Sequence, residues 1–205
     1  SLMNSVIVVG CSCFFNCVIA SMAAYGFEKK HFWGKEFLFK VYMLTLMIPG
    51  QVTMIPVFII MKKLGLLNTY FALVVIILNA FGVFLIRQFM ESVPDELLEA
   101  AKVDGCPEYK IFINIVIPLI KPVLVSLVVF TFVTSWNDFM WPLVSTTDSS
   151  MYTLTVALSL LKTQYQTNYG LILAGATVSF IFPFILYAFL QKQFVEGIAL
   201  SGVKG

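Results

Sequence analysis

Residues 170–190 read GLILAGATVSFIFPFILYAFL and contain no charged side chain. A helix of about 20 apolar residues covers the ~30 Å hydrocarbon core of a bilayer, so this run predicts a membrane-spanning helix. The whole chain of 205 residues has the same character, because 60% of its residues are hydrophobic and only 12% are charged. This composition is typical of an integral membrane protein. A net charge of +2, with no basic stripe, argues against nucleic-acid binding.

Four further stretches are candidate spans. Residues 1–27, 41–61 and 64–86 are free of charge, and 118–137 has only Lys121, whose amine can reach the membrane surface. Residues 149–161 are too short to cross and are expected to form a surface or re-entrant segment. The sequence therefore predicts an all-α, polytopic transmembrane helical bundle with five spans.

The basic residues predict the orientation of these spans, because Lys and Arg accumulate on the cytoplasmic side of membrane proteins. Ten of the 13 basic residues fall on one side of the five-span scheme. They are Lys29, Lys30, Lys35, Lys40, Arg87, Lys102, Lys110, Lys121, Lys192 and Lys204. The other side holds Lys62, Lys63 and Lys162. We therefore expect residues 87–117 and the tail 191–205 to be cytoplasmic, with 138–169 and the N-terminus outside.

The chain begins at Ser1 directly within a hydrophobic segment. It has no basic region or cleavage site of the kind that a signal peptide carries, so we expect an N-terminally truncated chain with six spans when complete. The four cysteines are expected to be free thiols, since three lie in an apolar segment and one in a cytoplasmic loop. They are Cys11, Cys13, Cys17 and Cys106.

The sequence lacks the residues that catalysis would require. The single histidine, His31, lies in a basic loop, so no histidine dyad or metal cage is expected. The nearest approach to a phosphate-binding loop, GIALSGVKG at 197–205, has Val203 where a lysine should follow Gly202. We therefore expect no catalytic residue, metal or cofactor in this chain, and any energy for transport must come from an ion gradient or another chain.

An ion-driven carrier would keep ionisable groups in mid-membrane. The best candidate is Asp138, but its position between Trp136 and Trp141 at the end of a span is more typical of an interfacial aromatic belt. An ion-coupled carrier and a non-transporting membrane scaffold remain as alternative functions.

Charge is concentrated in one central stretch, ELLEAAKVDGCPEYK at 96–110, where six of fifteen residues are charged. Ser92 is a plausible N-cap, Pro94 suits a first helical turn, Gly105 can adopt a positive φ and Pro107 can begin a second helix. We call residues 92–118 the elbow segment and predict helix, turn and helix within it. Leu97, Leu98 and Ala101 form an apolar face that suits docking to a partner, although spacing alone also fits a solvated connecting loop.

Two adjacent motifs in the elbow segment, EAAKVDG at 99–105 and INIVIP at 113–118, resemble the EAA signature of ABC importer permeases. That pattern is E-A-A, three residues, G, nine residues and then I-x-L-P. Ile117 replaces the leucine, which is a nearly isosteric change. The resemblance extends along the chain. The chain as a whole is similar to the second permease subunit of carbohydrate importers of the maltose-transporter type. It includes NSVIVV, AAYGF, MIPGQVTMIPVF, LGLLNTY, LIRQFMESVPDELLEAAKVDG, SWNDFMWPL and QFVEGIALSGVKG.

This resemblance implies a type I importer permease fold in the inner membrane, with residues 1–205 as a single permease domain. The elbow segment would be the coupling helix that docks on a separate ATPase, which carries the ATP and Mg²⁺. The implied partners are two ATPase subunits, a second homologous permease and an extracytoplasmic solute-binding protein. The signature assigns coupling roles to Glu99, Ala100, Ala101, Asp104, Gly105, Ile115 and Pro118. The resemblance also implies that Gly202, Lys204 and Gly205 in the tail contact the ATPase.

Candidates for the substrate path come from an interrupted span. Pro49, with Gly50 and Pro56, breaks the run 41–61, and broken helices in membranes line cavities or lie buried in protein. Gln51, Thr53 and Asn79 offer hydrogen bonds to sugar hydroxyls, although such side chains also join helices to one another. We expect Trp136, Asp138 and Trp141 in the outer loop to meet the binding protein.

Overall fold

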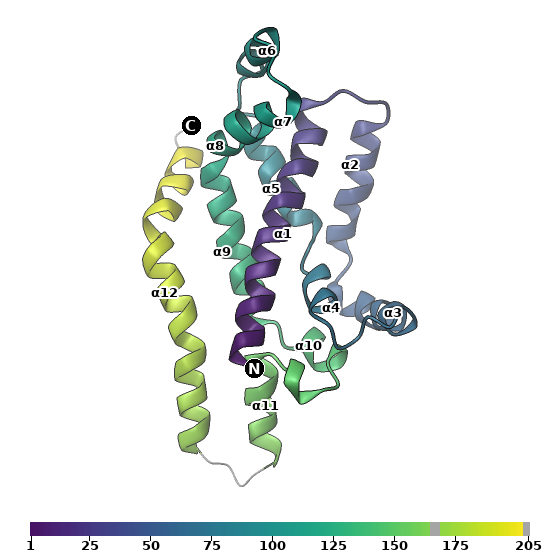
Figure 1. The fold of residues 1–205 in the computed structure, drawn as a ribbon, viewed down its shortest axis with the longest axis vertical. Coiled ribbons are helices and arrows are strands. Elements are labelled where there is room, and N and C mark those ends of the chain that lie inside the picture. Colours follow the sequence, from purple (N-terminus) through teal and green to yellow (C-terminus); the bar gives the residue numbers. More distant parts are fainter. Residues whose placement is uncertain (165–168, 203–205) are drawn as a thin grey trace. The chain divides into compact units, whose positions relative to one another are not determined.

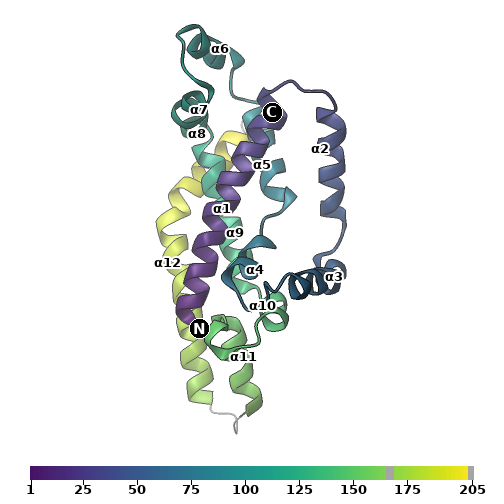
Figure 2. The ribbon, with the colours of Figure 1, turned by 45° about the vertical axis from the view of Figure 1, so that its right-hand side comes forward.

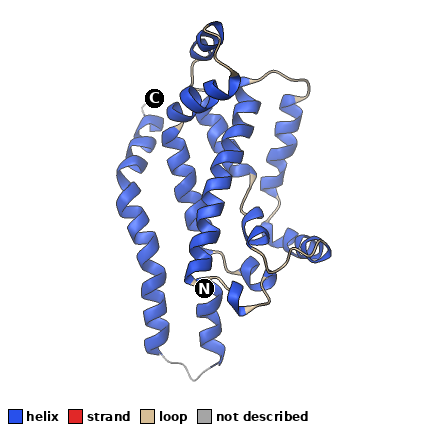
Figure 3. Cartoon of the chain, in the orientation of Figure 1, coloured by secondary structure: helices blue, strands red, loops and turns tan. Residues whose placement is uncertain are grey.

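The computed structural model describes residues 1–164 and 169–202, and all regular structure within those ranges is helical (Figure 3). This confirms the expected all-α fold. The elements, labelled in Figure 1, are α1 (Leu2–Lys29), α2 (Lys35–Leu44), η1 (Thr45–Met47), α3 (Gly50–Lys63), α4 (Tyr70–Val75), α5 (Ala80–Met90), α6 (Asp95–Val103), α7 (Glu108–Ile111), η2 (Phe112–Val116), α8 (Ile117–Leu119), α9 (Lys121–Asn137), α10 (Met140–Ser145), η3 (Ser149–Met151), α11 (Leu154–Gln164) and α12 (Tyr169–Gly202).

The chain packs as two compact units, each assembled from separated stretches of sequence. The first unit contains Ser1–Phe14, Pro49–Leu78 and Val129–Gln191. The second unit contains Phe15–Ile48, Asn79–Val128 and the chain from Lys192 onward. The chain passes from one unit to the other within α1, α9 and α12, so neither unit is a separable stretch of sequence. The single permease domain stays a prediction.

Two helices in the described ranges are individually long and apolar enough to span a membrane, namely Leu2–Lys29 and Gly170–Phe189. They confirm the spans expected at 1–27 and 170–190. Two bent helix pairs, Lys35–Met47 with Gly50–Lys63 and Glu108–Leu119 with Lys121–Asn137, raise the number to four if each pair counts as one span. The second of these pairs bends by 76°.

The expected span at 64–86 is not one helix. The chain forms α4, leaves the helical conformation and begins again with α5. Thr69 caps α4 by accepting a hydrogen bond from the backbone N–H of Ala72 at 3.2 Å, and Asn79 caps α5 by accepting from Phe81 at 3.0 Å. Such side-chain caps favour helix starts, so an uncharged run that contains two of them divides into two short helices.

The other expected segments also contain breaks. The run 41–61 is interrupted where Ile48 and Pro49 adopt extended backbone conformations, and Pro49 has no N–H to continue a helix. The run 118–137 becomes α9, preceded by α7, the π-helical turn η2 and α8. Residues 149–161 form η3 and most of α11, in agreement with a segment too short to cross.

The core of the second unit lies where α1, α5 and α9 approach closely. Gly82 allows this approach, because a Cβ atom there would lie 3.1 Å from the Cβ of Ala20 and 3.2 Å from Cδ1 of Leu127. A residue with a Cβ atom would require these neighbouring side chains to shift. The buried cluster continues towards the elbow segment through Ile86 and Met90 of α5. Figures 1 and 2 both place α6 beyond the ends of α1 and α5, next to α7.

The first unit has two smaller apolar clusters. Trp141 of α10 packs with Leu73 of α4 and Met61 of α3 in one of them. Trp136 of α9 packs with Val9 of α1 and Leu154 of α11 in the other. Both clusters therefore combine segments that are distant in sequence.

Candidate functional site

The turn at the centre of the elbow segment is a helix C-terminal motif closed by glycine. Gly105 has φ +76°, as the sequence predicts. The backbone N–H of Cys106 donates to the carbonyl of Ala101 at 3.0 Å, and that of Gly105 donates to Lys102 at 3.0 Å. These are the two hydrogen bonds of a Schellman motif, which satisfies carbonyls left over at a helix end and reverses the chain. The helix–turn–helix expected here is confirmed.

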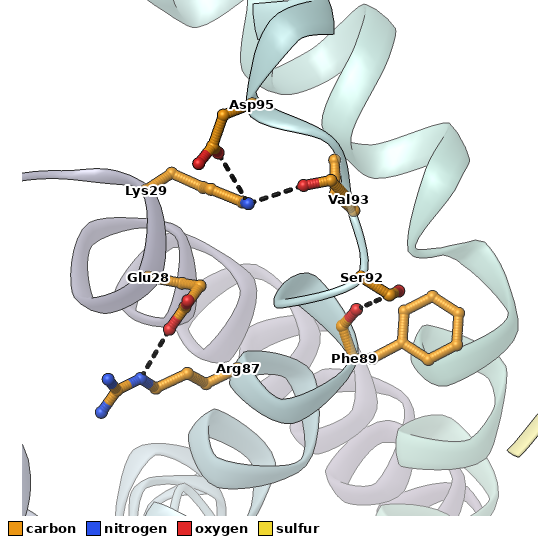
Figure 4. Close-up of polar contacts among 7 residues, drawn as sticks. All are labelled: Glu28, Lys29, Arg87, Phe89, Ser92, Val93 and Asp95. Atoms are coloured by element: carbon orange, nitrogen blue, oxygen red, sulfur yellow. Dashed lines mark hydrogen bonds and ion pairs between the residues drawn. The ribbon is translucent and has the colours of Figure 1, made fainter. Parts of the chain in front are cut away.

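The start of α6 differs from the prediction. Ser92 is not its N-cap, because the hydroxyl of Ser92 donates to the carbonyl of Phe89 at 2.7 Å and so closes the end of α5 (Figure 4). The helix begins one residue after Pro94, which occupies the N-cap position in an extended conformation. Asp95 and Glu96 lie in the first turn, where the helix dipole favours negative charge.

The two faces of α6 have different roles. Leu98 and Ala101 are buried in the core of the second unit. The prediction that these two side chains dock to a partner is therefore wrong. An amphipathic pattern indicates that one face is covered, but it does not indicate whether the chain itself or a partner covers it. Leu97 is half exposed, and Val103, on the opposite side of the helix from Leu98, is 88% exposed.

The remaining signature residues lie mainly on the surface. Glu99, Ala100, Asp104 and Gly105 are exposed, and Tyr109 at the start of α7 is exposed as well. Further along, Pro118 is exposed and Ile115 is half-buried. The exposed side of α6 therefore presents Glu99, Ala100 and Val103 together, because residues three and four apart share a helix face.

Charged side chains at the end of α1 hold the elbow segment. Lys29 donates to a carboxylate oxygen of Asp95 at 2.8 Å and to the carbonyl of Val93 at 2.7 Å (Figure 4). Lys30 forms an ion pair with Glu108, whose carboxylate also accepts a hydrogen bond from the hydroxyl of Tyr25. These contacts were not predicted from the sequence, in which the lysines indicated only the orientation of the spans. The available signal was the charged run Glu28, Lys29 and Lys30 directly after an apolar span.

The pair between Lys29 and Asp95 also affects a pKa. The hydrogen bond and the positive charge of Lys29 hold the pKa of the Asp95 carboxyl below its ordinary value. A lowered pKa means that this pair contributes stability above the ordinary carboxyl pKa of about 4 and loses it as the pH falls below that value. The Asp95 carboxyl is therefore ionised at neutral pH.

A second ionic cluster joins α5 to α1 and α2. Arg87 donates from Nε to Glu28 at 2.9 Å and from a terminal nitrogen to Glu36 at 3.0 Å. Its guanidinium also lies 3.9 Å from the ring centroid of Phe39. A planar guanidinium can satisfy two carboxylates and stack on an aromatic ring at once, so this residue fixes three helices of the second unit.

The tryptophans expected at an outer interface are core residues. Trp136 donates its indole N–H to the carbonyl of Ser179 at 3.1 Å, and Trp141 donates to Ala72 at 2.9 Å. Both side chains are buried, so the expectation that they contact a binding protein is corrected. The reason is that each indole has an internal carbonyl partner, which a hydropathy pattern does not reveal. Asp138, which lies between the two tryptophans in sequence, is half-buried.

The candidate path residues belong to different units. Pro49, Gln51 and Thr53 are exposed residues of the first unit, and the Thr53 hydroxyl donates to the carbonyl of Gly50 at 3.0 Å. Asn79 belongs to the second unit, where its side-chain oxygen caps α5. Of the tail residues, Gly202 ends α12, whereas Lys204 and Gly205 lie outside the described residues.

The helical fold, the long apolar helices and the elbow segment define an integral membrane protein with a charged, exposed helix–turn–helix. Comparison with known families identifies the class: the chain belongs to the binding-protein-dependent transport system inner membrane components, whose family pattern matches residues 17–199. It is therefore an inner-membrane permease component of a transport system of the ABC type.

Similar proteins agree with this assignment. The chain is 38% identical over 206 residues to the arabinooligosaccharides transport system permease protein AraQ of Halalkalibacterium halodurans, with 100% of this chain and 72% of AraQ covered. It is 36% identical over 188 residues to the lactose transport system permease protein LacG of Rhizobium radiobacter, with 91% of this chain and 68% of LacG covered. The fold matches a chain from the crystal structure of a bacterial ABC transporter involved in the import of the acidic polysaccharide alginate. That match has a TM-score of 0.73 at 23% identity and covers 100% of this chain and 74% of the other.

Proposed function

We propose that this chain is the permease subunit of an ATP-driven importer of oligosaccharides or related sugars. The observation that carries the proposal is the family match over residues 17–199, together with similarity over the full chain length to a permease named for arabinooligosaccharides. A second relative, the diacetylchitobiose uptake system permease protein DasC of Streptomyces coelicolor, is 31% identical over 205 residues. These relatives support a carbohydrate substrate without choosing among sugars.

In this proposal α6 is the contact with a separate ATPase. Its exposed face presents the acidic Glu99 beside Ala100 and Val103, a small apolar surface next to charged residues. Its opposite face is held by the core of its own unit. A helix that is rigidly supported on one side and exposed on the other suits the transmission of movement from a partner. The sequence has no phosphate-binding loop, so ATP and Mg²⁺ would bind to two ATPase subunits.

The complete transporter would also contain a second homologous permease and an extracytoplasmic solute-binding protein. The two permeases would share the path, to which Pro49, Gln51, Thr53 and Asn79 are candidate contributors. Selection of the sugar would begin at the binding protein, so the permease sequence alone does not determine it.

The test is affinity purification of the complex, followed by reconstitution into proteoliposomes. We expect an ATPase, a second permease and a binding protein to purify with this chain. Uptake of labelled arabinooligosaccharide, lactose or diacetylchitobiose should require ATP, and should stop when the phosphate-loop lysine of the ATPase is replaced. The isolated chain should bind no Mg-ATP. Uptake that survives loss of the ATPase and collapses with an ion gradient would contradict the proposal.

A further inference from the structure

The C-terminal end of α1 places three consecutive charged residues against three different elements. Glu28 contacts Arg87 of α5 at 2.9 Å, Lys29 contacts Asp95 at the start of α6 at 2.8 Å, and Lys30 contacts Glu108 at the start of α7. Consecutive residues of a helix point about 100° apart, and Lys30 directly follows Lys29, the last residue of α1, so this short stretch can reach three neighbours. Figure 4 shows the first two of these contacts.

Lys29 is the most enclosed of these cations. Its side chain is 5% exposed, whereas that of Asp95 is 71% exposed. A buried ammonium group is costly unless it has partners, and Lys29 has both the Asp95 carboxylate and the carbonyl of Val93. The two acceptors belong to the residues on either side of Pro94. Lys29 therefore holds the backbone just before α6 through the Val93 carbonyl, and the first residue of α6 through the Asp95 carboxylate.

The opposite end of the same helix–turn–helix is held from α1 too. The Glu108 carboxylate forms an ion pair with Lys30 and accepts a hydrogen bond from the Tyr25 hydroxyl. The Lys30 ammonium also lies 4.9 Å from the centroid of the Tyr25 ring. Tyr25 in turn packs on Phe112, with ring centroids 5.2 Å apart. The start of α6 and the start of α7 are therefore both attached to the last two turns of α1 and to Lys30, which follows them.

We propose that Lys29 is a positioning residue that makes α6 and α1 move as one body. We call the contacts of Tyr25, Lys29 and Lys30 with Asp95 and Glu108 the α1 clamp. The clamp rests on the proposed function: a partner pressing on α6 would move α1, a membrane-spanning helix, through the clamp. Without it, α6 would keep its apolar base of Leu98 and Ala101 but lose these polar attachments to α1.

The decisive variants keep the core intact. Asp95→Asn removes one charge from an exposed site at constant shape, and Lys29→Met removes the cation but keeps the length of the side chain. Lys29→Arg preserves the charge, and the exchange Lys29→Asp with Asp95→Lys restores an opposite pair. Lys40→Met is the matched control, because Lys40 is an exposed lysine of the same unit without an ion pair in the described part of the chain.

The first measurement is sugar transported per ATP hydrolysed by the whole complex in proteoliposomes. Asp95→Asn and Lys29→Met should lower this ratio about threefold to fivefold, the loss expected when one partly exposed ion pair is removed. Lys29→Arg should recover most of it, the charge exchange should recover the part that comes from the ion pair but not the hydrogen bond to the Val93 carbonyl, and Lys40→Met should match the unmodified complex. An unchanged ratio in Asp95→Asn and Lys29→Met, with normal uptake, would overturn the clamp and leave the proposed function standing.

The second measurement needs no substrate. A spin label on Cys106, an exposed thiol directly after the Gly105 turn, reports the motion of the elbow segment in membranes when Cys11, Cys13 and Cys17 are replaced by serine. Breaking the clamp should shift the label towards its mobile spectral component, and the charge exchange should reverse the shift. Equal mobility in all variants would overturn the clamp even if the complex proved to carry no sugar.

Discussion

At Gly105 the backbone conformation, and not the space around the residue, restricts which side chain can be accommodated. A Cβ atom built there would meet nothing within 4 Å, yet the residue has φ +76°. L-residues pay about 1–2 kcal/mol for the left-handed conformation, whereas asparagine tolerates it better than most. The effect of a substitution at this position therefore depends on the backbone preference of the new residue and not on its size.

We predict that Gly105→Val weakens the link between ATP hydrolysis and transport. A β-branched residue disfavours the left-handed turn, so the Schellman hydrogen bonds of Gly105 and Cys106 should break and α6 should tilt. A strain of about 1.4 kcal/mol corresponds to a tenfold loss of the competent conformation, which should appear as transport per ATP hydrolysed in the reconstituted complex.

Two controls separate backbone strain from simple perturbation of this turn. Gly105→Asn should retain most coupling, because asparagine accepts a positive φ. Cys106→Ala should be nearly silent, because the motif uses only the backbone of Cys106. If Gly105→Val transports with normal coupling, the turn has no coupling role.

At the scale of the element, α6 is a helix with one structural face and one free face. Leu98 is 4% exposed within the core of the second unit, whereas Val103 is 88% exposed. The same substitution on these two faces should therefore produce two different defects, one in the stability of the chain and one in its association with a partner.

We predict that Val103→Asp leaves the chain folded but reduces its association with the ATPase, because it places a charge on an apolar contact. Leu98→Asp should instead lower the thermal stability of the isolated chain, since burial of an unpaired carboxylate is strongly unfavourable. Thermal unfolding and co-purification with the ATPase measure the two effects. Normal ATPase binding by Val103→Asp would show that this face of α6 is not the contact.

At the scale of the whole molecule, the basic residues are divided unequally between the two units. Within the described residues, nine of the 12 lysines and arginines belong to the second unit, and Lys62, Lys63 and Lys162 belong to the first. The same nine were assigned to the cytoplasmic side from the span pattern alone. The packing units and the positive-inside rule therefore divide these basic residues in the same way.

We predict that α6 is cytoplasmic and that the η3 region is outside. In a cysteine-free background, Lys102→Cys should react with a membrane-impermeant thiol reagent only after the cells are permeabilised. Ser149→Cys should react in intact cells. Both positions are exposed on the chain, so differences in reactivity report the side of the membrane. Ready labelling of position 102 in intact cells would contradict the predicted orientation and place α6 outside.

Local features of the sequence determined the all-α fold, two of the spans and the turn at Gly105. Apolar length is a property of a single segment, so residues 1–27 and 170–190 were predicted correctly. A positive φ after a helix is likewise a local requirement that glycine meets best. The prediction of one continuous helix at 64–86 was wrong because it counted charge alone, while Thr69 and Asn79 start new helices within this segment.

Only the tertiary structure decided which polar and apolar groups meet. Lys29 and Asp95 are 66 residues apart in sequence, so no periodicity could pair them. The same holds for the indole of Trp136, whose carbonyl partner Ser179 is 43 residues away. Helical spacing assigned Leu98 and Ala101 to one apolar face, but whether that face is covered by the chain or by a partner depends on the packing of distant helices. That packing buries both residues in the second unit and leaves Glu99 and Val103 exposed.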